Sequence, residues 1–451
     1  MAAGVWSPER RALTVGLVAT VTLVAFESLA VSTIAPDIEE DLGDLALYGW
    51  VFSGFFLGGL VGTVLGGRVV DRRGPVPAYV GGLALFAGGL VLGGLAPTML
   101  TLVVARVVQG LGAGAVPAVA YVTVGRAYPE ELRPRMFAVT STAWVVPGLV
   151  GPAMAGAIAS ATTWRAVFLG LTPLVLVAGT VTVRALRGSV ADDPPPAAPA
   201  GAAVGGAIQV AVGVGLLTAG LAASPWWKAA ALVAGGAAVG APAFVRLVPA
   251  GTVRAAPGLP AAVLARGLLT FAFFGADAYV PLALTETRGT STTVAGLAVT
   301  AATLSWTAGS WVQERRVLAL GARRMVRTGF AVLLAGLGGA ALFLWDGVPL
   351  PLAVVVWAAA GLGIGLAYAP ISVTVLREAP PGRTGEATAA MQLSDVVGIS
   401  LGTGAGGAAI AVGDAAGWVP AVGVGLAFGL AAAVGVVGLL VARRLPGPVP
   451  R

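Results

Sequence analysis

Four carboxylic acids stand inside or beside long apolar stretches of the sequence. They are Glu27, Asp277, Glu286 and Asp395. An ionisable side chain inside such a stretch is costly, so it is by default a candidate for function. Apolar surroundings disfavour the charged form of a carboxyl group, and the group can then take up and release a proton near neutral pH. We expect this proton chemistry at Glu27, Asp277 and Asp395, and we expect Glu286 at the outer rim of its stretch.

Two arginines lie within the same kind of stretch. Arg106 is well inside and could form a switchable ion pair with one of the acids. Gln109, one helical turn away, could orient Arg106 or face a cavity. Arg266 stands near the end of its stretch, where we expect it to extend to water as an anchor. The alternative for every buried charge is a static ion pair that holds the helices together.

Aromatic side chains are the second kind of candidate. Together they could line a cavity for an aromatic or cationic cargo, since aromatic faces attract cations. Ordinary packing in the core or against lipid is the alternative for each one. The set comprises Trp144, Trp306 and Trp357, predicted deep inside apolar stretches, with Phe271, Phe273, Phe274, Tyr279 and Tyr368.

The composition excludes several classes of protein. Hydrophobic residues make up 57% and charged residues 10%, whereas soluble domains carry roughly 25% charged residues. The chain has no Cys and no His, so it lacks thiol chemistry, the usual general base and the commonest metal ligand. No Walker A loop is present, and Gly-rich runs lie inside apolar stretches rather than after strands. We therefore expect no enzyme, no metal and no organic cofactor.

The elements that must position these residues are membrane-spanning helices. Apolar stretches of about 20 residues, the length that crosses a bilayer core, recur along the chain. They predict an all-α polytopic membrane protein with fourteen transmembrane helices, at approximately 12–34, 48–67, 76–97, 99–124, 136–160, 164–184, 204–223, 227–246, 259–284, 292–312, 325–345, 349–375, 387–411 and 417–441.

The basic residues indicate the orientation. All but five of the 27 fall on alternate loops and the two tails. Arg165, Lys228 and Arg288 lie on the opposite side, and Arg106 and Arg266 lie within apolar stretches. The chain is predicted to lie in the cytoplasmic membrane. By the positive-inside rule, both of its termini are predicted to face the cytoplasm. The net charge of +7 is then a topology signal, and no nucleic-acid partner is expected.

The chain divides into four predicted parts. Residues 1–186 form a six-helix half, 187–206 a cytoplasmic linker rich in Pro, Ala and Gly, 207–256 two additional helices and 257–451 a second six-helix half. The Asp71-Arg72-Arg73 sequence, in the loop after the second helix, is matched by Glu314-Arg315-Arg316 in the second half. Internal repeats of this kind are typical of secondary transporters.

Several motifs of the first half resemble those of the major facilitator superfamily, and in particular its fourteen-helix drug:proton antiporters. The matching segments are Phe26-Glu27-Ser28 with Ile34-Ala35-Pro36; Gly67-Arg-Val-Val-Asp71-Arg72-Arg73-Gly74; Arg106-Val-Val-Gln109-Gly110-Leu-Gly112; Pro147-Gly148-Leu-Val-Gly151-Pro152-Ala-Met-Ala-Gly156; and Thr163-Trp164-Arg165. The chain departs from the family pattern at Pro75 and Val76, where basic residues are usual, and at Glu27, where many relatives have Asp.

The resemblance implies two sets of gating residues. Gly67, Asp71, Arg72 and Gly74 would hold the halves together on the cytoplasmic side, with Asp71 near the start of the helix at Gly385 and Glu386. Bending and close packing of the fifth helix would depend on Gly148, Gly151, Pro152 and Gly156. A solvated loop charge and generic membrane-helix packing are the respective alternatives.

The predicted function is secondary active transport by alternating access. Protons, bound at Glu27, Asp277 and Asp395 with Arg106 as partner, would be exchanged for an amphiphilic or cationic drug held between the halves. The predicted cargo contacts are Gln109, Trp144, Phe274, Tyr279, Trp306 and Trp357. A lipid or glycolipid exporter on the same scaffold is the first alternative, and a non-transporting receptor or assembly protein the second. The chain is expected to be a monomer among membrane lipids.

Overall fold

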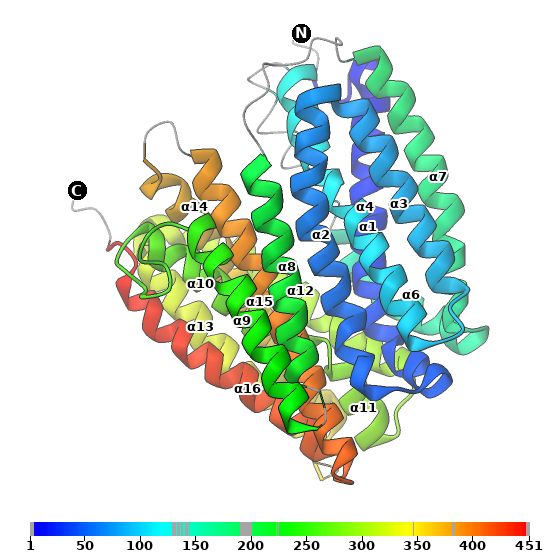
Figure 1. The fold of residues 1–451 in the computed structure, drawn as a ribbon, viewed down its shortest axis with the longest axis vertical. Coiled ribbons are helices and arrows are strands. Elements are labelled where there is room, and N and C mark those ends of the chain that lie inside the picture. Colours follow the sequence, from blue (N-terminus) through cyan, green and yellow to red (C-terminus); the bar gives the residue numbers. More distant parts are fainter. Residues whose placement is uncertain are drawn as a thin grey trace.

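The computed structural model describes residues 4–128, 132, 136, 139, 143, 145–189, 201–221, 223, 225–345, 347–380 and 384–447. Regular secondary structure in these ranges is helical throughout (Figure 1). Trp144 and most of the predicted linker, at 190–200, lie outside the described residues. The helical architecture confirms the predicted fold class.

The described helices form three successive groups along the chain. The first group comprises α1 (Pro8–Leu42), α2 (Leu45–Arg73), α3 (Pro75–Gly94), α4 (Met99–Ala127), α6 (Val145–Ala161) and α7 (Trp164–Ser189). Next come α8 (Gly201–Leu221) and α9 (Trp226–Leu247). The last group comprises α10 (Leu259–Asp277), α11 (Val280–Arg288), α12 (Thr292–Leu320), α13 (Ala322–Ala340), α14 (Leu350–Glu378), α15 (Thr384–Ala415) and α16 (Pro420–Val441).

Twelve helical segments of the described chain are long and apolar enough to cross a membrane. A shorter apolar helix, Val146–Ala161, lies within α6. Each of the fourteen predicted stretches overlaps a helix, but α12, at the tenth stretch, is not among the twelve. Membrane spanning is thus confirmed, whereas the number fourteen stays a prediction.

The ninth predicted span is broken in two. Its first part, α10, ends at Asp277, and α11 begins at Val280 with Pro281 in its first turn. Proline has no backbone N–H and clashes with the preceding turn, so a continuous helix cannot pass through Pro281 without losing a hydrogen bond. The predicted span at 259–284 is confirmed, since Leu259–Arg288 is one of the twelve segments long and apolar enough to cross a membrane. Its break at Ala278 and Tyr279 was not predicted, because it depends on a single residue inside an apolar run.

Helix packing separates the two groups. In the first group α4 packs against α2 and α3, and α1 packs against α7; in the last group α14 packs against α12 and α13, and α10 packs against α15. The two groups meet mainly through α2 against α15 and α6 against α12. The helix α8 packs on α9, α2 and α15, and α9 remains largely exposed. This arrangement is compatible with the predicted six-plus-two-plus-six division, which stays a prediction.

Two glycines mark the same turn in the two groups. Gly74 joins α2 to α3 with φ +83°, and Gly321 joins α12 to α13 with φ +78°. A side chain is strained at such φ values, so glycine is needed at both turns. Asp71 lies three residues before Gly74, but Glu314 lies seven before Gly321. The acid–arginine match predicted from sequence is therefore about one helical turn out of register.

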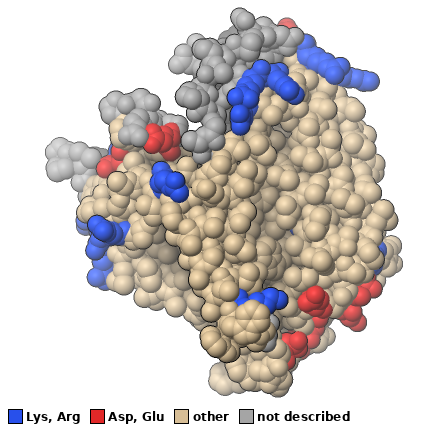
Figure 2. Space-filling model, in the orientation of Figure 1, with Lys and Arg blue, Asp and Glu red and all other residues tan. Residues whose placement is uncertain are grey.

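Charge is distributed unevenly over the two ends of the bundle. Figure 2 shows most of the visible Lys and Arg toward the end that carries the termini and the larger group of Asp and Glu at the opposite end, with a smaller patch of the other sign at each end. The second end, called the acidic end below, is where α1 finishes and α2 begins, with Asp37, Glu39, Glu40, Asp41 and Asp44. This asymmetry is the one expected from the positive-inside rule.

The contacts that join the two helix groups gather toward the acidic end. Asp37 of α1 accepts a hydrogen bond from the Thr292 hydroxyl at the start of α12. Ser53 of α2 donates to the carbonyl of Ser400 at 2.9 Å, and its hydroxyl lies 2.9 Å from that of Thr403 on α15. Together with the aromatic contacts described below, these bonds close the acidic end of the interface between the groups.

Candidate functional site

The first functional cluster joins α1 to α4. Arg106 Nη1 donates to Glu27 Oε1 and, at 3.0 Å, to Gln109 Oε1. The Gln109 amide donates to the same Glu27 oxygen at 3.2 Å. All three side chains are buried, with 2% exposure or less. The structure thus pairs Arg106 with Glu27, one of the acids considered from the sequence, and Gln109 contacts both members of the pair.

The two oxygens of Glu27 differ in their surroundings. Oε1 accepts the hydrogen bonds from Arg106 and Gln109, while Oε2 is buried and has no partner among the described residues. A buried polar atom without a partner is unfavourable. A proton on Oε2 removes the negative charge and leaves Oε1 as an acceptor. The arrangement can therefore hold a proton beside Arg106.

Close packing of α2 on α4 fixes Arg106. Its Nε donates to the Val51 carbonyl at 2.9 Å, and its guanidinium carbon lies 4.4 Å from the centroid of the Phe55 ring. The helices approach closely because glycines face each other's backbones. An added methyl group at Gly110 would lie only 2.0 Å from the Phe55 carbonyl oxygen. The Arg-x-x-Gln-Gly pattern thus combines the charge of Arg106 with the amide of Gln109 that contacts it. It also supplies Gly110, the small residue that lets α2 pack close to α4.

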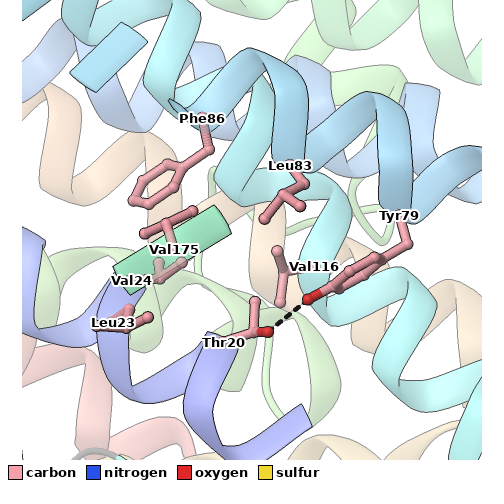
Figure 3. A pocket seen from close by; sticks show the side chains of 8 residues that line it. All are labelled: Thr20, Leu23, Val24, Tyr79, Leu83, Phe86, Val116 and Val175. Atoms are coloured by element: carbon pink, nitrogen blue, oxygen red, sulfur yellow. Dashed lines mark hydrogen bonds between the residues drawn. The ribbon is translucent and has the colours of Figure 1, made fainter. Parts of the chain in front are cut away.

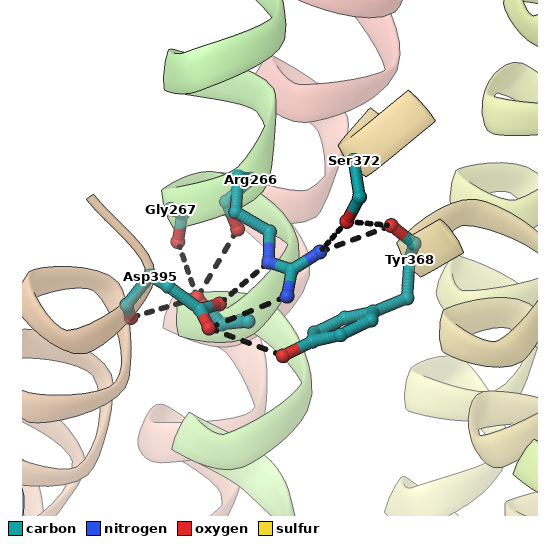
Figure 4. Close-up of polar contacts among 6 residues, drawn as sticks. Arg266, Gly267, Tyr368, Ser372 and Asp395 are labelled. Carbon is teal, nitrogen blue, oxygen red and sulfur yellow. Dashed lines mark hydrogen bonds and ion pairs between the residues drawn. The ribbon is translucent and has the colours of Figure 1, made fainter. Parts of the chain in front are cut away.

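The second cluster joins α10, α14 and α15 (Figure 4). Arg266 Nε and Nη2 donate to the two oxygens of Asp395 at 2.8 and 3.4 Å. Nη1 donates to the Tyr368 carbonyl at 3.0 Å and to the Ser372 hydroxyl at 3.1 Å. The Tyr368 hydroxyl donates to Asp395 Oδ2 at 3.1 Å, and the guanidinium carbon lies 3.0 Å from the Tyr368 ring centroid. We call Arg266, Tyr368, Ser372 and Asp395 the clasp.

The clasp overturns the expectation for Arg266. Instead of extending to water, the side chain is buried with 1% exposure and points to Asp395. The sequence prediction was wrong because Asp395 lies 129 residues away in the chain, and no periodicity shows that α10 and α15 pack together. A buried arginine is held inside when a carboxylate satisfies it.

Aromatic rings connect the two clusters. Ring centroids are 5.6 Å apart for Phe55–Phe56, 6.3 Å for Phe56–Phe274, 6.1 Å for Phe274–Trp306 and 5.4 Å for Trp306–Tyr368. We call these five residues the aromatic bridge. It begins under Arg106, crosses from α2 to α10 between the two helix groups and ends under Arg266. Phe274 and Trp306 were predicted as cargo contacts, whereas Phe55 and Phe56 were missed, although both lie near the middle of the second predicted helix.

Four members of the bridge are half-buried: Phe56, Phe274, Trp306 and Tyr368. Partial exposure in the middle of a bundle leaves ring surface available to a ligand. Aromatic pairs separated by 4.5–7 Å gain specific stabilisation, so the rings hold one another in place. The bridge therefore offers a preformed aromatic surface between two buried ion pairs.

Two predicted cargo residues lie elsewhere. The Tyr279 hydroxyl donates to the Thr403 carbonyl, and its ring packs 5.7 Å from Tyr48 and 6.4 Å from Phe52, so it belongs to the closed acidic end. Trp357 is fully buried and stacks on Phe273 with centroids 6.0 Å apart. In this conformation neither ring is exposed, and their contact with cargo stays a prediction.

Asp277 stands apart from both clusters. It is the last residue of α10, is 6% exposed and has one carboxyl oxygen, Oδ1, without a partner in the described chain. The expected positional counterpart of Glu27 thus lies beside the helix break rather than in an ion pair. Glu286, in α11, is exposed, as expected for a rim position.

Only part of the predicted cytoplasmic gate can be placed. Gly67 and the exposed Arg72 lie in the last part of α2, and Gly74 forms the turn that follows. The side chain of Asp71 lies outside the described residues. The contact predicted between Asp71 and the start of α15 therefore stays a prediction.

The small residues of α6 face the second helix group. An added methyl group would lie 2.2 Å from Thr303 Cγ2 at Gly148, and 2.9 Å from the Thr293 Cα at Gly156. Gly151 faces Phe26 of α1, and the Pro152 carbonyl lies against Gly296. Close approach of α6 to α12 thus requires glycine at positions 148 and 156.

A small pocket lies between α1, α3, α4 and α7 (Figure 3). The hydroxyls of Thr20 and Tyr79, two of its lining residues, are joined by a hydrogen bond. The cavity measures about 10 Å³, close to the minimum for one water molecule. The remaining lining is apolar: Leu23, Val24, Leu83, Phe86, Val116 and Val175. This pocket has no room for a cargo molecule.

Two bacterial relatives have descriptions that concern drug efflux. A probable multidrug-efflux transporter of Mycobacterium tuberculosis is 27% identical over 459 residues, covering 94% of each chain. The multidrug efflux pump SdrM of Staphylococcus aureus is 25% identical over 164 residues, covering 36% of this chain and 37% of the relative.

Solved structures show the same fold. The crystal structure of a D-xylose-proton symporter superposes with a TM-score of 0.70 at 14% identity, covering 97% of this chain and 98% of the other. A bacterial homolog of the human lysosomal transporter Spinster, in an inward-facing and unoccupied conformation, gives a TM-score of 0.66 at 14% identity with the same coverage. At such identities the likeness concerns the fold alone.

The family model described as Major Facilitator Superfamily matches residues 16–403, well over half of the chain. This match confirms the resemblance drawn from the motifs of the first helix group. The match does not distinguish the fourteen-helix subfamily from the rest of the superfamily, so that narrower assignment stays a prediction. The chain belongs to the Major Facilitator Superfamily and is a multi-span membrane transporter.

Proposed function

We propose that this transporter exports amphiphilic or cationic aromatic drugs in exchange for protons. The observation that carries the proposal is the aromatic bridge, whose half-buried rings lie between two buried ion pairs. Aromatic surfaces beside carboxylates favour flat cationic molecules. Relatives described as multidrug-efflux transporters support the same cargo class.

In this proposal Glu27 is the proton site. Its Oε2 is the free position, and protonation there weakens the attraction of the carboxyl group for Arg106. Arg106 is held to α2 through the Val51 carbonyl and the Phe55 ring. A change in charge at Glu27 is therefore transmitted to α2, which contacts α15 of the other helix group. Alternating access requires such a link between a titrating group and the interface that opens.

We further propose that both termini face the cytoplasm and that the acidic end faces outward across the cytoplasmic membrane. The separation of basic and acidic residues between the two ends supports this orientation (Figure 2). Since the chain has no cysteine, single cysteines introduced at Asp44 and at Arg72 can be labelled with an impermeant maleimide. In intact cells, labelling of the cysteine at position 72 but not of the cysteine at position 44 would show the opposite orientation.

The coupling proposal is tested with Glu27→Gln. The amide can still accept a hydrogen bond from Arg106, but it cannot bind and release a proton. We expect proteoliposomes with an imposed pH gradient to lose gradient-driven dye transport while the purified variant still binds the dye. Glu286→Gln, at an exposed acid of α11, is the matched control and should transport normally. Unchanged gradient-driven transport by Glu27→Gln would exclude Glu27 as the proton site.

A further inference from the structure

The two buried ion pairs differ in how completely the carboxylate is satisfied. Glu27 leaves Oε2 without a partner. In Asp395 both oxygens are engaged, Oδ1 by Arg266 Nε at 2.8 Å and Oδ2 by Arg266 Nη2 at 3.4 Å and the Tyr368 hydroxyl at 3.1 Å. Paired donors from a guanidinium stabilise the ionised carboxylate. The clasp therefore satisfies the ionised form of Asp395 at both of its oxygens.

The clasp also lies at the accessible end of the aromatic bridge. Tyr368 and Ser372 are half-buried, and the Tyr368 ring continues through Trp306 into the bridge at 5.4 Å. Arg266 places a flat, delocalised cation over the face of Tyr368 and against the carboxylate of Asp395 (Figure 4). An aromatic ring and a carboxylate are the two partners that recognise a flat organic cation.

We propose that the guanidinium of Arg266 is an internal substitute for the cationic group of the cargo. An aromatic cation that stacks on the bridge takes the place of the guanidinium at Tyr368 and Asp395, and the freed carboxylate neutralises the cargo. This inference rests on the proposed function, because it assigns residues to the binding of the same cargo. It makes Asp395 the residue that selects for positive charge.

In this proposal the displaced Arg266 moves toward the nearer end of α10. Its Nη1 already donates to the Tyr368 carbonyl and to Ser372, which lies one turn further along α14 toward the end of that helix at Glu378. Arg266 is seven residues from the start of α10, about 10 Å along the helix, and that start is bonded to Arg444 near the chain terminus. When cargo displaces it, the long side chain would turn toward the start of α10 and the end of the bundle that carries Arg444.

Exchange of one cation for another leaves the charge near Asp395 balanced. A cation that merely added to the clasp would meet the positive charge of Arg266. A neutral aromatic molecule can bind on Phe56, Phe274 and Trp306 without moving Arg266, because no carboxylate has to be freed. The bridge thus selects for aromatic character and the clasp selects for charge.

Equilibrium binding to the purified full-length protein in detergent tests the inference. The probes are ethidium, a flat aromatic cation, and Nile red, a neutral aromatic dye, followed by fluorescence anisotropy. The loss of a charge-assisted contact predicts that Asp395→Asn weakens ethidium binding about tenfold or more, with Nile red binding unchanged. Arg266→Gln removes the internal competitor and should tighten ethidium binding only. Asp414→Asn, at an exposed acid of the same helix α15, is the control and should alter neither dye.

Several outcomes overturn the inference. Equal weakening of both dyes by Asp395→Asn would show a structural role, as would failure of Asp395→Glu to restore any preference for ethidium. Weaker ethidium binding by Arg266→Gln would show that Arg266 does not compete with the cargo. If a single variant does not fold, R266Q/D395N removes both charges together, and its ethidium-to-Nile red affinity ratio must still fall. Absence of binding of either dye to the unaltered protein would instead refute the proposed cargo class itself.

Discussion

Locking the acidic end should stop transport. The hydroxyl oxygens of Ser53 on α2 and Thr403 on α15 are 2.9 Å apart, and both side chains are fully buried between the two helix groups. The sulfur atoms of a disulfide are separated by about 2.05 Å, so S53C/T403C can form one with a shift of roughly 1 Å. Since the chain has no other cysteine, oxidation will form this bond alone.

The expected result is near-complete loss of dye efflux in oxidised proteoliposomes and full recovery on reduction. Each single-cysteine variant should be insensitive to the oxidant. T98C/T101C provides the matched control, because its hydroxyls are also 2.9 Å apart but both belong to the start of α4. Transport at the normal rate by fully cross-linked S53C/T403C would refute the reasoning that this end must open in the transport cycle.

Two further predictions concern packing and the bridge. Gly110→Ala should lower the melting temperature of the purified protein, because the new methyl group would lie 2.0 Å from the Phe55 carbonyl oxygen and overpacking costs about 1–3 kcal/mol; Gly81→Ala, which meets no atom within 4 Å, should melt unchanged. Trp306→Ala interrupts the bridge and should raise the KM for an aromatic dye about tenfold, roughly the effect of losing an aromatic pair, whereas Trp306→Phe should retain most of the affinity. An unchanged KM for Trp306→Ala would remove the bridge from the cargo site.

The location of helices could be predicted from sequence far better than their ends. A run such as 12–34 is recognisable because a helix of that many apolar residues is long enough to cross a bilayer core. The helix α1 nevertheless extends from Pro8 to Leu42, because a helix can continue into charged residues that lie outside the hydrocarbon core. The break before Val280 was missed for the opposite reason: Pro281 changes the backbone without changing the hydrophobicity.

The first ion pair was accessible to sequence reasoning and the second was not. Glu27 and Arg106 each stand alone in an apolar run, so each needed a partner, and the motif around Arg106 supplied Gln109. Arg266 lies close enough to the end of its stretch for contact with water to be a sufficient explanation. Only the packing of α10 on α15 shows that Asp395 Oδ1 lies 2.8 Å from Arg266 Nε.

The polarity of the two ion pairs is reversed, and this bears on how they act together. In the first helix group the acid, Glu27, lies on the first helix, whereas in the last group the first helix, α10, carries the base, Arg266. Each arginine stacks on a ring at one end of the aromatic bridge. A cargo that displaces Arg266 from Tyr368 and a proton that loosens Arg106 from Glu27 therefore act on opposite ends of one row of rings. Since Phe56 and Phe274 meet where that row crosses between the helix groups, both events bear on the interface that must rearrange during transport.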